Sequence, residues 1–386
     1  MFHIAGQKDI KEGKITDVYF LRTAEILKEK NLQQRVVAEV TLKAFPQGWK
    51  WGLLAGLEEA ARLLEGLPVD VYSMPEGTFF GVEQPVLFIE GKYLDFLSYE
   101  TSLLGLLCQA SGIATKASRC RKMAGHRLVV SFGARRMHPA IAPMIERNAF
   151  IGGCDGVAVT KSAELIHEQP VGTMPHSLIL MMGDTLQACI AFHETMSPDI
   201  RRVALIDTFC DEKEEAIQVA EKLGQSLSAV RLDTPSSRRG NMRQILEEVR
   251  WELDLRGFQG VKLFVSGGID EDQILELNPV ADAYGIGTSL SNAPVLDFSL
   301  DIVEIEGRPI SKRGKKSGRK QVLRCPHCYR SKVVPSGLVE QICTCKIPPD
   351  HLLTPLIMNG KIARDLLSPQ DIRQFVLRQL EMVTLS

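Results

Sequence analysis

Short apolar runs alternate with helical patterns between residues 101 and 290, and this alternation limits the folds that the chain can adopt. Strand-like runs lie at residues 128–133, 157–161, 203–207, 229–233, 261–267 and 281–285. The clearest helical patterns lie at 211–223, which opens with acidic residues, and at 241–255, whose apolar residues share one face. Strands that alternate with helices predict a parallel sheet with helices outside it. Six strands fall short of eight, so we expect an α/β fold with an irregular or incomplete β/α barrel; an open doubly wound sheet is the alternative.

The chain on either side of this segment has a different character. Residues 1–100 contain an extended run at 36–42, a helical stretch at 52–64 and a hairpin region marked by glycine and proline at 75–91. The C-terminal part begins with a strand-like run at 298–306 and ends with a helical tail. We therefore expect three parts: an N-terminal α+β domain (1–100), a β/α-barrel domain (101–292) and a small C-terminal zinc-binding region (293–386).

Composition and charge are those of an ordinary globular protein. The 386 residues are 45% hydrophobic and 24% charged, and the formal net charge is −1. A chain with so little net charge is not attracted as a whole to nucleic acid or to anionic membranes. The sequence shows no apolar run of membrane-spanning length and no signal-peptide core, so we expect a soluble cytoplasmic protein whose nine cysteines are reduced or bind metal.

Two successive strand-like runs end in glycine, the first with Gly267 and Gly268 and the second with Gly287, which Thr288 follows. Glycine lets a phosphate approach backbone N–H groups closely, and the last strands of a β/α barrel often carry such a site. We therefore expect a phosphate cup at these four residues. Two ordinary strand-to-helix turns are the alternative.

A cationic segment follows the first barrel strand. Phe132 precedes Arg135, Arg136 and His138. Guanidinium groups bind carboxylate and phosphate through paired hydrogen bonds, and an aromatic ring beside them suits the stacking of a flat ring. The segment is thus expected to bind an anionic substrate that contains a ring, and an exposed basic loop is the alternative.

Further polar residues lie where later elements begin or end. Asp207 and Asp233 each end a strand, with Arg231 close to the second, and an aspartate there can hold Mg²⁺ or a sugar hydroxyl. An N-cap of the following helix is the alternative for each aspartate. The segment 172–177 is typical of a capped helix start, which explains the presence of Thr173. A helix start does not require His176, so this residue has either no specific role or a functional one.

Four cysteines in the C-terminal part have the spacing of a metal site. Cys325 and Cys328 form a Cys-x-x-Cys pair, and Cys343 and Cys345 form a second pair after fourteen intervening residues. Four thiolates can close a tetrahedron around a structural Zn²⁺ ion. Because the second pair is Cys-x-Cys, a neighbouring histidine, His327 or His351, is an alternative ligand. We call residues 325–345 the zinc knob.

A basic run precedes the zinc knob, with six lysines and arginines in the nine residues 312–320. A basic run beside a zinc module also occurs in nucleic-acid-binding proteins, which gives a competing class of function. The run lacks interleaved aromatic residues, and a phosphate-rich small molecule explains its charge as well as RNA does.

In their order and spacing, these motifs resemble the nicotinate phosphoribosyltransferase family, the type II phosphoribosyltransferases of NAD salvage. The zinc knob resembles the short archaeal-type branch of that family. The resemblance covers most of the chain up to about residue 320. The matching motifs lie at 16–19, 75–78, 100–101, 111–115, 132–136, 172–177, 206–208, 231–234, 266–268 and 285–287.

The resemblance implies a role for each candidate residue. The base stacks between Phe132 and the Tyr19 ring of a neighbouring subunit, which implies a homo-oligomer built from dimers with shared sites. Arg135 and Arg136 hold the base carboxylate or the pyrophosphate, ATP phosphorylates His176, and the glycine cup receives the 5′-phosphate of phosphoribosyl pyrophosphate. We expect catalysis by His176, Arg135, Arg136, Asp207 and Asp233, and substrate binding by Tyr19, Phe132, His138, Thr173, Arg231, Gly267, Gly268, Gly287 and Thr288.

The implied reaction displaces pyrophosphate from the anomeric carbon of ribose. It requires an aligned ring nitrogen and a leaving group neutralised by Mg²⁺, arginine and lysine, and it requires no protein nucleophile. Nicotinamide and quinolinate are the alternative bases. Relatives that take the amide carry an aspartate shortly after the glycine that corresponds to Gly156, where this chain has Val-Ala-Val at 157–159, and Asp155 lies before that glycine. We therefore expect nicotinate as the substrate and ATP as a co-substrate.

Overall fold

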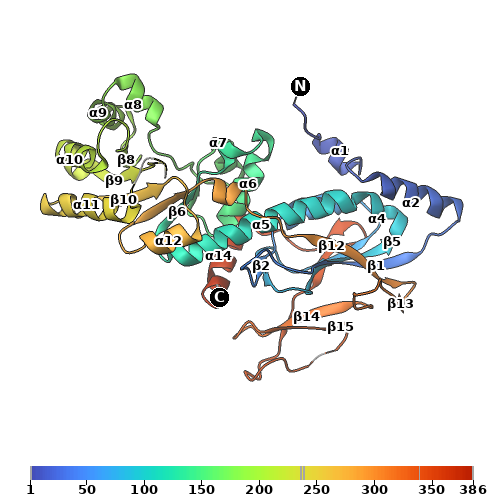
Figure 1. The fold of residues 1–386 in the computed structure, drawn as a ribbon. Helices are drawn as coiled ribbons and strands as arrows, with labels where there is room; N and C mark the ends of the chain where they lie inside the picture. Colours follow the sequence, from blue (N-terminus) through green and yellow to red (C-terminus); the bar gives the residue numbers. More distant parts are fainter. Residues whose placement is uncertain (1, 235–236, 238–239, 339, 385–386) are drawn as a thin grey trace. The chain divides into compact units, whose positions relative to one another are not determined.

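The structure is a computed structural model, and it describes residues 2–234, 237, 240–338 and 340–384. By its internal contacts the chain forms two compact units, residues 1–115 with 294–386, and residues 116–293 (Figure 1). The boundary lies inside the long helix α5 (Glu100–Ala124). The division of the sequence at residues 100 and 292 stays a prediction.

The first unit is built on a seven-stranded sheet to which both ends of the chain contribute. The strands follow the order β13-β12-β1-β5-β3-β17-β18. The interior strand β1 runs antiparallel to both neighbours, so that Ala38 lies opposite Ile302 on one side and Ile89 on the other. The strands are β1 (Arg35–Leu42), β3 (Asp70–Ser73), β5 (Pro85–Lys92), β12 (Phe298–Ile305), β13 (Arg308–Pro309), β17 (Thr354–Met358) and β18 (Lys361–Ile362).

Two local expectations for this unit are wrong. The stretch 52–64 is helical only from Leu57, because Gly56 has a positive φ of 82° and separates α3 (Leu57–Leu64) from β2 (Gly52–Leu53). The region 75–91 contains β4 (Phe79–Phe80) and β5, which do not pair as a hairpin, since β4 pairs with β2 and β5 pairs with β1 and β3. The remaining helices that precede α5 are α1 (Gln7–Lys11), α2 (Val18–Glu29), α4 (Tyr93–Phe96) and the 3₁₀ turn η1 (Leu97–Tyr99).

The C-terminal region adds a small sheet and the predicted helical tail. Strand β14 (Lys320–Arg324) lies between β15 (Ser331–Pro335) and β16 (Asp350–His351). Helix α14 (Pro369–Leu380) begins with a proline in its first turn, and Ser368 accepts a hydrogen bond from the Asp371 backbone N–H at its N-cap. Its buried residues include Ile372, which lies against Gly77.

The second unit contains the predicted parallel sheet. Its six strands follow the order β7-β6-β11-β10-β9-β8, and all neighbours are parallel (Figure 1). The sheet curls into a half-barrel, which confirms the expected incomplete β/α barrel. The strands are β6 (Leu128–Ser131), β7 (Gly156–Val157), β8 (Arg202–Leu205), β9 (Leu227–Leu232), β10 (Lys262–Ser266) and β11 (Ala283–Ile286). The run at 157–161 is shorter than expected because helix α7 already begins at Thr160.

Helices surround this sheet as the sequence indicates. Asp211 caps α10 (Glu212–Leu223), which carries three glutamates in its first turn, and Asn241 caps α11 (Met242–Leu255). The other helices are α6 (Ala142–Ile151), α7 (Thr160–Leu165), α8 (His176–Met182), α9 (Thr185–Thr195), α12 (Glu271–Leu277) and α13 (Thr288–Ser291), with 3₁₀ turns η2 (Ala134–Arg136), η3 (Pro139–Ile141) and η4 (Gly224–Ser226). No helix among the described residues is long and apolar enough to cross a membrane.

Apolar side chains fill the middle of the half-barrel and fix the position of Phe132. The cluster contains Val130, Ala229 and Phe264, and Phe132 packs against it. A β-carbon on Gly285 would lie 2.4 Å from the Phe132 ring, so only glycine at this position lets the ring lie against β11. The ring is thereby held at the carboxyl end of the strands, where β/α barrels carry their active sites.

Candidate active site

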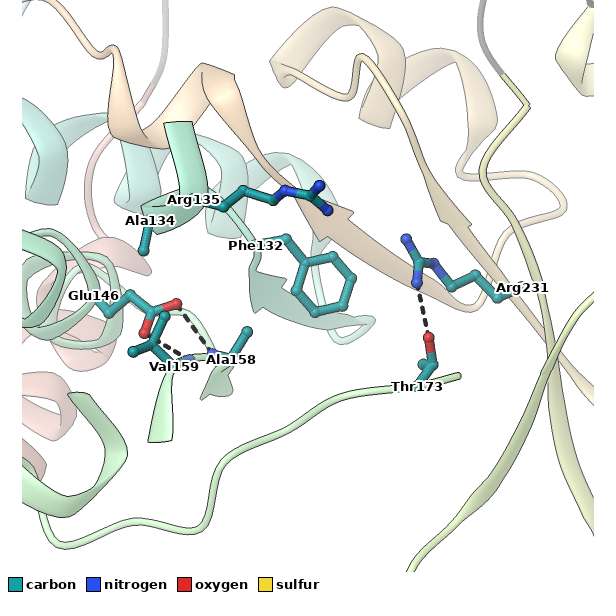
Figure 2. A pocket seen from close by; sticks show the side chains of 8 residues that line it. All are labelled: Phe132, Ala134, Arg135, Glu146, Ala158, Val159, Thr173 and Arg231. Atoms are coloured by element: carbon teal, nitrogen blue, oxygen red, sulfur yellow. Dashed lines mark hydrogen bonds between the residues drawn. The ribbon is translucent and has the colours of Figure 1, made fainter. Parts of the chain in front are cut away.

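A pocket of about 190 Å³ lies beside Phe132 in the second unit (Figure 2). Its wall combines the segment that follows β6, the segment that follows β7, one residue of β9 and the loop before α8. The lining residues are Phe132, Ala134, Arg135, Glu146, Ala158, Val159, Thr173 and Arg231. Three predicted substrate-binding residues and one predicted catalytic arginine are thus brought together.

Arg231 is held in place on one side of the Phe132 ring. Its guanidinium carbon lies 5.1 Å from the ring centroid, which is cation–π distance. Its Nη1 donates to Thr173 Oγ1 at 2.7 Å and its Nε donates to Ser266 Oγ at 2.9 Å. Its Nη2 lies 3.3 Å from Asp233 Oδ2. This network fixes a cation beside the aromatic ring.

The two adjacent arginines differ in their relation to the pocket. Both belong to η2 and both are exposed, but only Arg135 lines the pocket. Within the described part of the chain, neither guanidinium has an ion-pair or hydrogen-bond partner. His138 is also exposed, and its Nδ1 accepts a hydrogen bond from the Ala140 backbone N–H at 3.1 Å, so it caps η3.

His176 pairs with Asp207. His176 Nε2 lies 3.0 Å from Asp207 Oδ1, and Asp207 Oδ2 accepts a hydrogen bond of 3.0 Å from the Asp233 backbone N–H. The Asp207 side chain is 2% exposed and that of His176 is 41% exposed. Helix α8 starts at His176 as expected, but no side chain caps it, and Thr173 binds Arg231 instead of a helix end.

The glycine-rich loops follow two adjacent strands. Ser266 lies opposite Gly285 in the β10–β11 pair, so the loops that contain Gly267 and Gly287 leave the sheet side by side. Gly267 and Gly268 have φ values of 86° and 76°, which side chains rarely adopt, and the space around Gly268 is open. The motif-adjacent Ser289 Oγ is buried and has no hydrogen-bond partner among the described residues.

Tyr19 belongs to the first unit. It lies on α2 with 54% of its surface exposed. The neighbouring Asp17 accepts a hydrogen bond from Thr101 Oγ1 at 2.8 Å, which joins two of the predicted motifs, 16–19 and 100–101. The motif around Tyr19 is therefore anchored while the ring itself stays available for contact.

Glu146 is a site residue that the sequence analysis missed. It lies on α6, is fully buried, and lines the pocket beside Ala158 and Val159. Burial raises the pKa of its carboxyl, and the N–H groups of these two residues oppose the shift. The available signal was a glutamate between buried positions such as Ile145 and Ala149 of one helix.

The basic run lies along acidic residues of the first unit. Lys315 Nζ lies 2.8 Å from Asp301, and Lys320 Nζ lies 2.8 Å from the buried Glu39. Lys312, Lys316 and Arg319 also pair with carboxylates. Most of the positive charge of the run is thus balanced within the fold.

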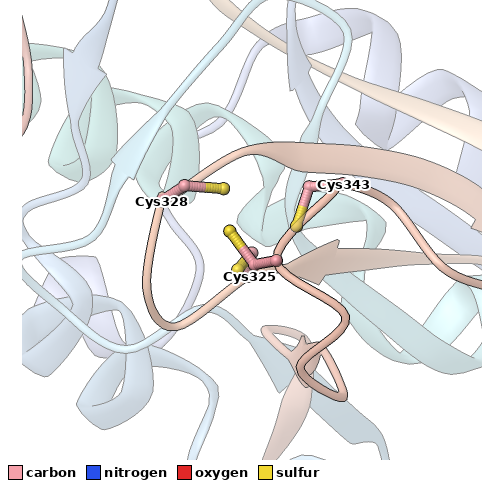
Figure 3. Close-up of side chains that lie close together, drawn as sticks. Cys325, Cys328 and Cys343 are labelled. Atoms are coloured by element: carbon pink, nitrogen blue, oxygen red, sulfur yellow. The ribbon is translucent and has the colours of Figure 1, made fainter.

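The four cysteines of the zinc knob converge, and Figure 3 shows three of them, Cys325, Cys328 and Cys343. The Sγ atoms of Cys325, Cys328, Cys343 and Cys345 lie within 4.8 Å of one another. A tetrahedral zinc–thiolate centre places its sulfur atoms roughly 3.8 Å apart, so the donor set fits such an ion. The Cys328 backbone N–H, helped by that of His327, lowers the pKa of Cys325 to about 6, which favours the thiolate form that binds metal.

Fold and site together define a type II phosphoribosyltransferase. Residues 17–111 match the N-terminal domain of quinolinate phosphoribosyl transferase, and residues 113–301 match its C-terminal domain. The chain therefore belongs to the family of nicotinate and quinolinate phosphoribosyltransferases, and the resemblance seen in the sequence is confirmed.

Individual proteins and solved structures are similar to this chain over most of its length. A nicotinate phosphoribosyltransferase of Mycobacterium tuberculosis is 29% identical over 416 residues, which cover 93% of this chain and 89% of that protein. That of Bacillus subtilis is 26% identical and covers 78% of this chain and 68% of that protein. The crystal structure of nicotinate-nucleotide pyrophosphorylase from Pyrococcus furiosus shares 55% identity and a TM-score of 0.97, over 99% of this chain and 98% of that one. Human nicotinic acid phosphoribosyltransferase shares the fold, with a TM-score of 0.75 at 18% identity, over 96% of this chain and 94% of that one.

Proposed function

We propose that the protein is a nicotinate phosphoribosyltransferase of NAD salvage. It joins nicotinate to the phosphoribosyl group of phosphoribosyl pyrophosphate, releases pyrophosphate, and couples this transfer to ATP hydrolysis. The observation that carries the proposal is the pocket that combines the Phe132 ring with a fixed guanidinium, that of Arg231, and an unpaired one, that of Arg135.

The base binds on the Phe132 ring. A pyridine ring stacks on the phenyl face, and its carboxylate pairs with Arg135, which has no partner among the described residues. The Arg231 guanidinium is already bound to Thr173, Ser266 and Asp233. It therefore contributes a fixed positive charge near the base and is not free to form a bidentate pair with the base carboxylate. Arg136 lies outside the pocket lining, and we assign it to the pyrophosphate.

The phosphoribosyl group occupies the neighbouring strand ends. Its 5′-phosphate lies in the cup of Gly267, Gly268, Gly287 and Thr288. Two observations support this assignment: the space around Gly268 is open, and the Ser289 hydroxyl has no partner among the described residues. Asp233, whose side chain is 28% exposed, faces the ribose hydroxyls or Mg²⁺. Mg²⁺ supplies neutralisation of the leaving pyrophosphate when it is bound.

In this scheme, most of the rate enhancement comes from the positioning of the two substrates. The ring nitrogen is aligned with the anomeric carbon by stacking on Phe132 and by the Arg135 pair, and cationic side chains balance the charge of the leaving group. No Ser-His-Asp arrangement is required, because the displaced group is already activated as pyrophosphate.

ATP coupling uses His176. Because the Asp207 carboxylate can only accept a hydrogen bond, it assigns the proton to His176 Nε2 and leaves the lone pair on Nδ1 as the phosphoryl acceptor. Both Asp207 oxygens accept hydrogen bonds and the side chain is almost fully buried, so we assign Asp207 to the positioning of His176.

The remaining assignments follow the same scheme. The zinc knob binds one structural Zn²⁺ ion, Tyr19 covers the base from a neighbouring subunit of a dimer, and His138 contributes to substrate binding. The enzyme is favoured over a nucleic-acid-binding module because five of the six cations at 312–320 pair with carboxylates of the fold. The cytoplasmic location stays a prediction.

Product analysis tests the proposal. The protein is incubated with nicotinate, phosphoribosyl pyrophosphate and Mg²⁺, with and without ATP, and the products are separated by chromatography. We expect nicotinate mononucleotide and pyrophosphate in both reactions, with ADP and phosphate formed only when ATP is present. Absence of the mononucleotide under both conditions would reject the proposed function.

A further inference from the structure

A buried carboxylate forms part of the wall of the base pocket. Glu146 Oε1 accepts a hydrogen bond from the Ala158 backbone N–H and Oε2 accepts one from the Val159 backbone N–H, both at 3.0 Å. The residue is 0% exposed, and no lysine, arginine or histidine in the described part of the chain forms an ion pair with it. In Figure 2 these three residues lie on one side of Phe132, and Arg231 with Thr173 lies on the other.

The two N–H groups would otherwise be free to bind an anion. Consecutive backbone N–H groups that point to one spot form a concave site for a carboxylate or phosphate. Here the protein fills that site with its own carboxylate. The two N–H bonds favour the ionised carboxylate and oppose the effect of burial on the Glu146 pKa. With Glu146 ionised, the side of the pocket at residues 158–159 presents negative charge and apolar side chains to the base, while positive charge comes from Arg135 and Arg231.

The bases of this family differ by one carboxylate. Nicotinate carries a single carboxylate, which Arg135 can pair, whereas quinolinate carries a second one on the neighbouring ring carbon. A second carboxylate that reaches the wall formed by residues 146, 158 and 159 finds both N–H donors already bonded and meets a like charge. Juxtaposed like charges are unfavourable where water is excluded, so the second carboxylate weakens binding.

We propose that Glu146 is a specificity-determining residue that excludes dicarboxylate bases from the pocket by occupying the Ala158 and Val159 N–H groups with its own carboxylate. This proposal rests on the proposed function, since it explains why the pocket takes a monocarboxylate. Glu146 acts on the substrate through its charge, whereas neighbouring residues determine the shape of the pocket.

The test compares a dicarboxylate with a monocarboxylate as inhibitors of nicotinate transfer. Phthalate and benzoate are the two probes, because neither has a ring nitrogen that can react. The variants are Glu146→Gln and the apolar Glu146→Leu, both of which remove the charge. Glu164→Gln is the matched control, because Glu164 lies on the adjacent α7 with 66% of its side chain exposed.

We expect phthalate inhibition to strengthen by about tenfold or more relative to benzoate in either charge-removing variant, and to stay unchanged in the control. The KM for nicotinate should change far less than the inhibition constant of phthalate. Either folded variant suffices, and thermal unfolding identifies the folded ones.

An unchanged ratio of phthalate to benzoate inhibition in a folded variant would overturn the proposal, as would an equal loss of affinity for phthalate, benzoate and nicotinate, which marks a purely structural role. Failure of the proposed function looks different. In that case the parent protein converts quinolinate, with release of CO₂, in preference to nicotinate, and the inference falls with it.

Discussion

His176 Nε2 lies 3.0 Å from the buried carboxylate oxygen Oδ1 of Asp207, at the carboxyl edge of the half-barrel. The pair joins the start of α8 to the end of β8, two segments that carry separate motifs in the sequence. It holds the imidazole through Nε2 and leaves Nδ1 outside this bond, which is the arrangement that the proposed phosphorylation of His176 requires.

Replacement of His176 tests the coupling to ATP. We predict that His176→Ala abolishes ATP hydrolysis but retains slow transfer without ATP, because the base pocket and the phosphate cup are untouched. Release of phosphate from ATP and formation of mononucleotide are measured in the same samples. ATP hydrolysis at the parent rate would show that another residue accepts the phosphate.

Asp207→Asn tests the positioning role. The amide can also donate to the ring, so the proton on Nε2 is no longer assigned, and we predict a loss of ATP hydrolysis of about 10²-fold with a smaller change in the KM for nicotinate. The direct observable is ³¹P NMR of phosphohistidine. Undiminished phosphohistidine in the variant would leave Asp207 without this role.

The assignment of the base carboxylate is tested with the two adjacent arginines. We predict that Arg135→Ala lowers kcat/KM for nicotinate by about 10- to 100-fold, the value of a charge-assisted hydrogen bond, and changes nicotinamide turnover little. Arg136→Ala is the matched control, because Arg136 lies in the same turn but does not line the pocket. A larger nicotinate-specific loss in Arg136→Ala would reverse the assignment.

The zinc knob is tested by metal analysis. We predict one zinc per chain in protein purified without chelator, and its loss in the Cys325→Ser/Cys328→Ser variant, with a lower unfolding temperature of the C-terminal region and most of the transfer activity retained. Cys210→Ser is the control, because Cys210 is exposed and lies outside the cluster. Full zinc retention in the double variant would reject this ligand set.

Glu100 predicts a pH dependence of stability. Burial, followed by the nearby Asp301 carboxylate, raises the pKa of Glu100 from 4.5 to about 7. In the folded state Glu100 keeps its proton up to about pH 7, while the unfolded chain loses it near pH 4.5. Folding therefore binds a proton in this window, and the free energy of unfolding must decrease as the pH rises through it. Denaturant titrations should show this decrease for the parent and a smaller one for Glu100→Gln. An equal decrease in Glu100→Gln, or a reduced one in the exposed control Glu25→Gln, would contradict the prediction.

Features set by local patterns were predictable. The alternation of strands and helices led to the parallel half-barrel, and the spacing of the four cysteines led to a cluster whose Sγ atoms lie within 4.8 Å of one another. Asp211 and Asn241 cap the helices that their acidic and apolar patterns indicate. Each of these signals lies within one segment of the chain.

Features that depend on distant segments were not predictable from one sequence. Strand β12 pairs with β1 although Ala38 and Ile302 are far apart in the chain. The sequence of a strand contains no signal that identifies the distant strand with which it pairs. The His176–Asp207 pair has the same character. The role of Glu146 in the pocket was not predicted because a glutamate in a helix is usually a surface residue. Only the fold shows that two backbone N–H groups bond to its carboxylate.

Side-by-side kinetics with nicotinate, nicotinamide and quinolinate, at saturating phosphoribosyl pyrophosphate and Mg²⁺, test the central claim most directly. The account predicts that kcat/KM for nicotinate exceeds that for nicotinamide by about 10- to 100-fold or more, because the amide cannot form the charge-assisted pair with the Arg135 guanidinium. It also predicts no release of CO₂ from quinolinate. Equal kcat/KM for acid and amide, or a preference for quinolinate with release of CO₂, would contradict the assignment of nicotinate as the substrate.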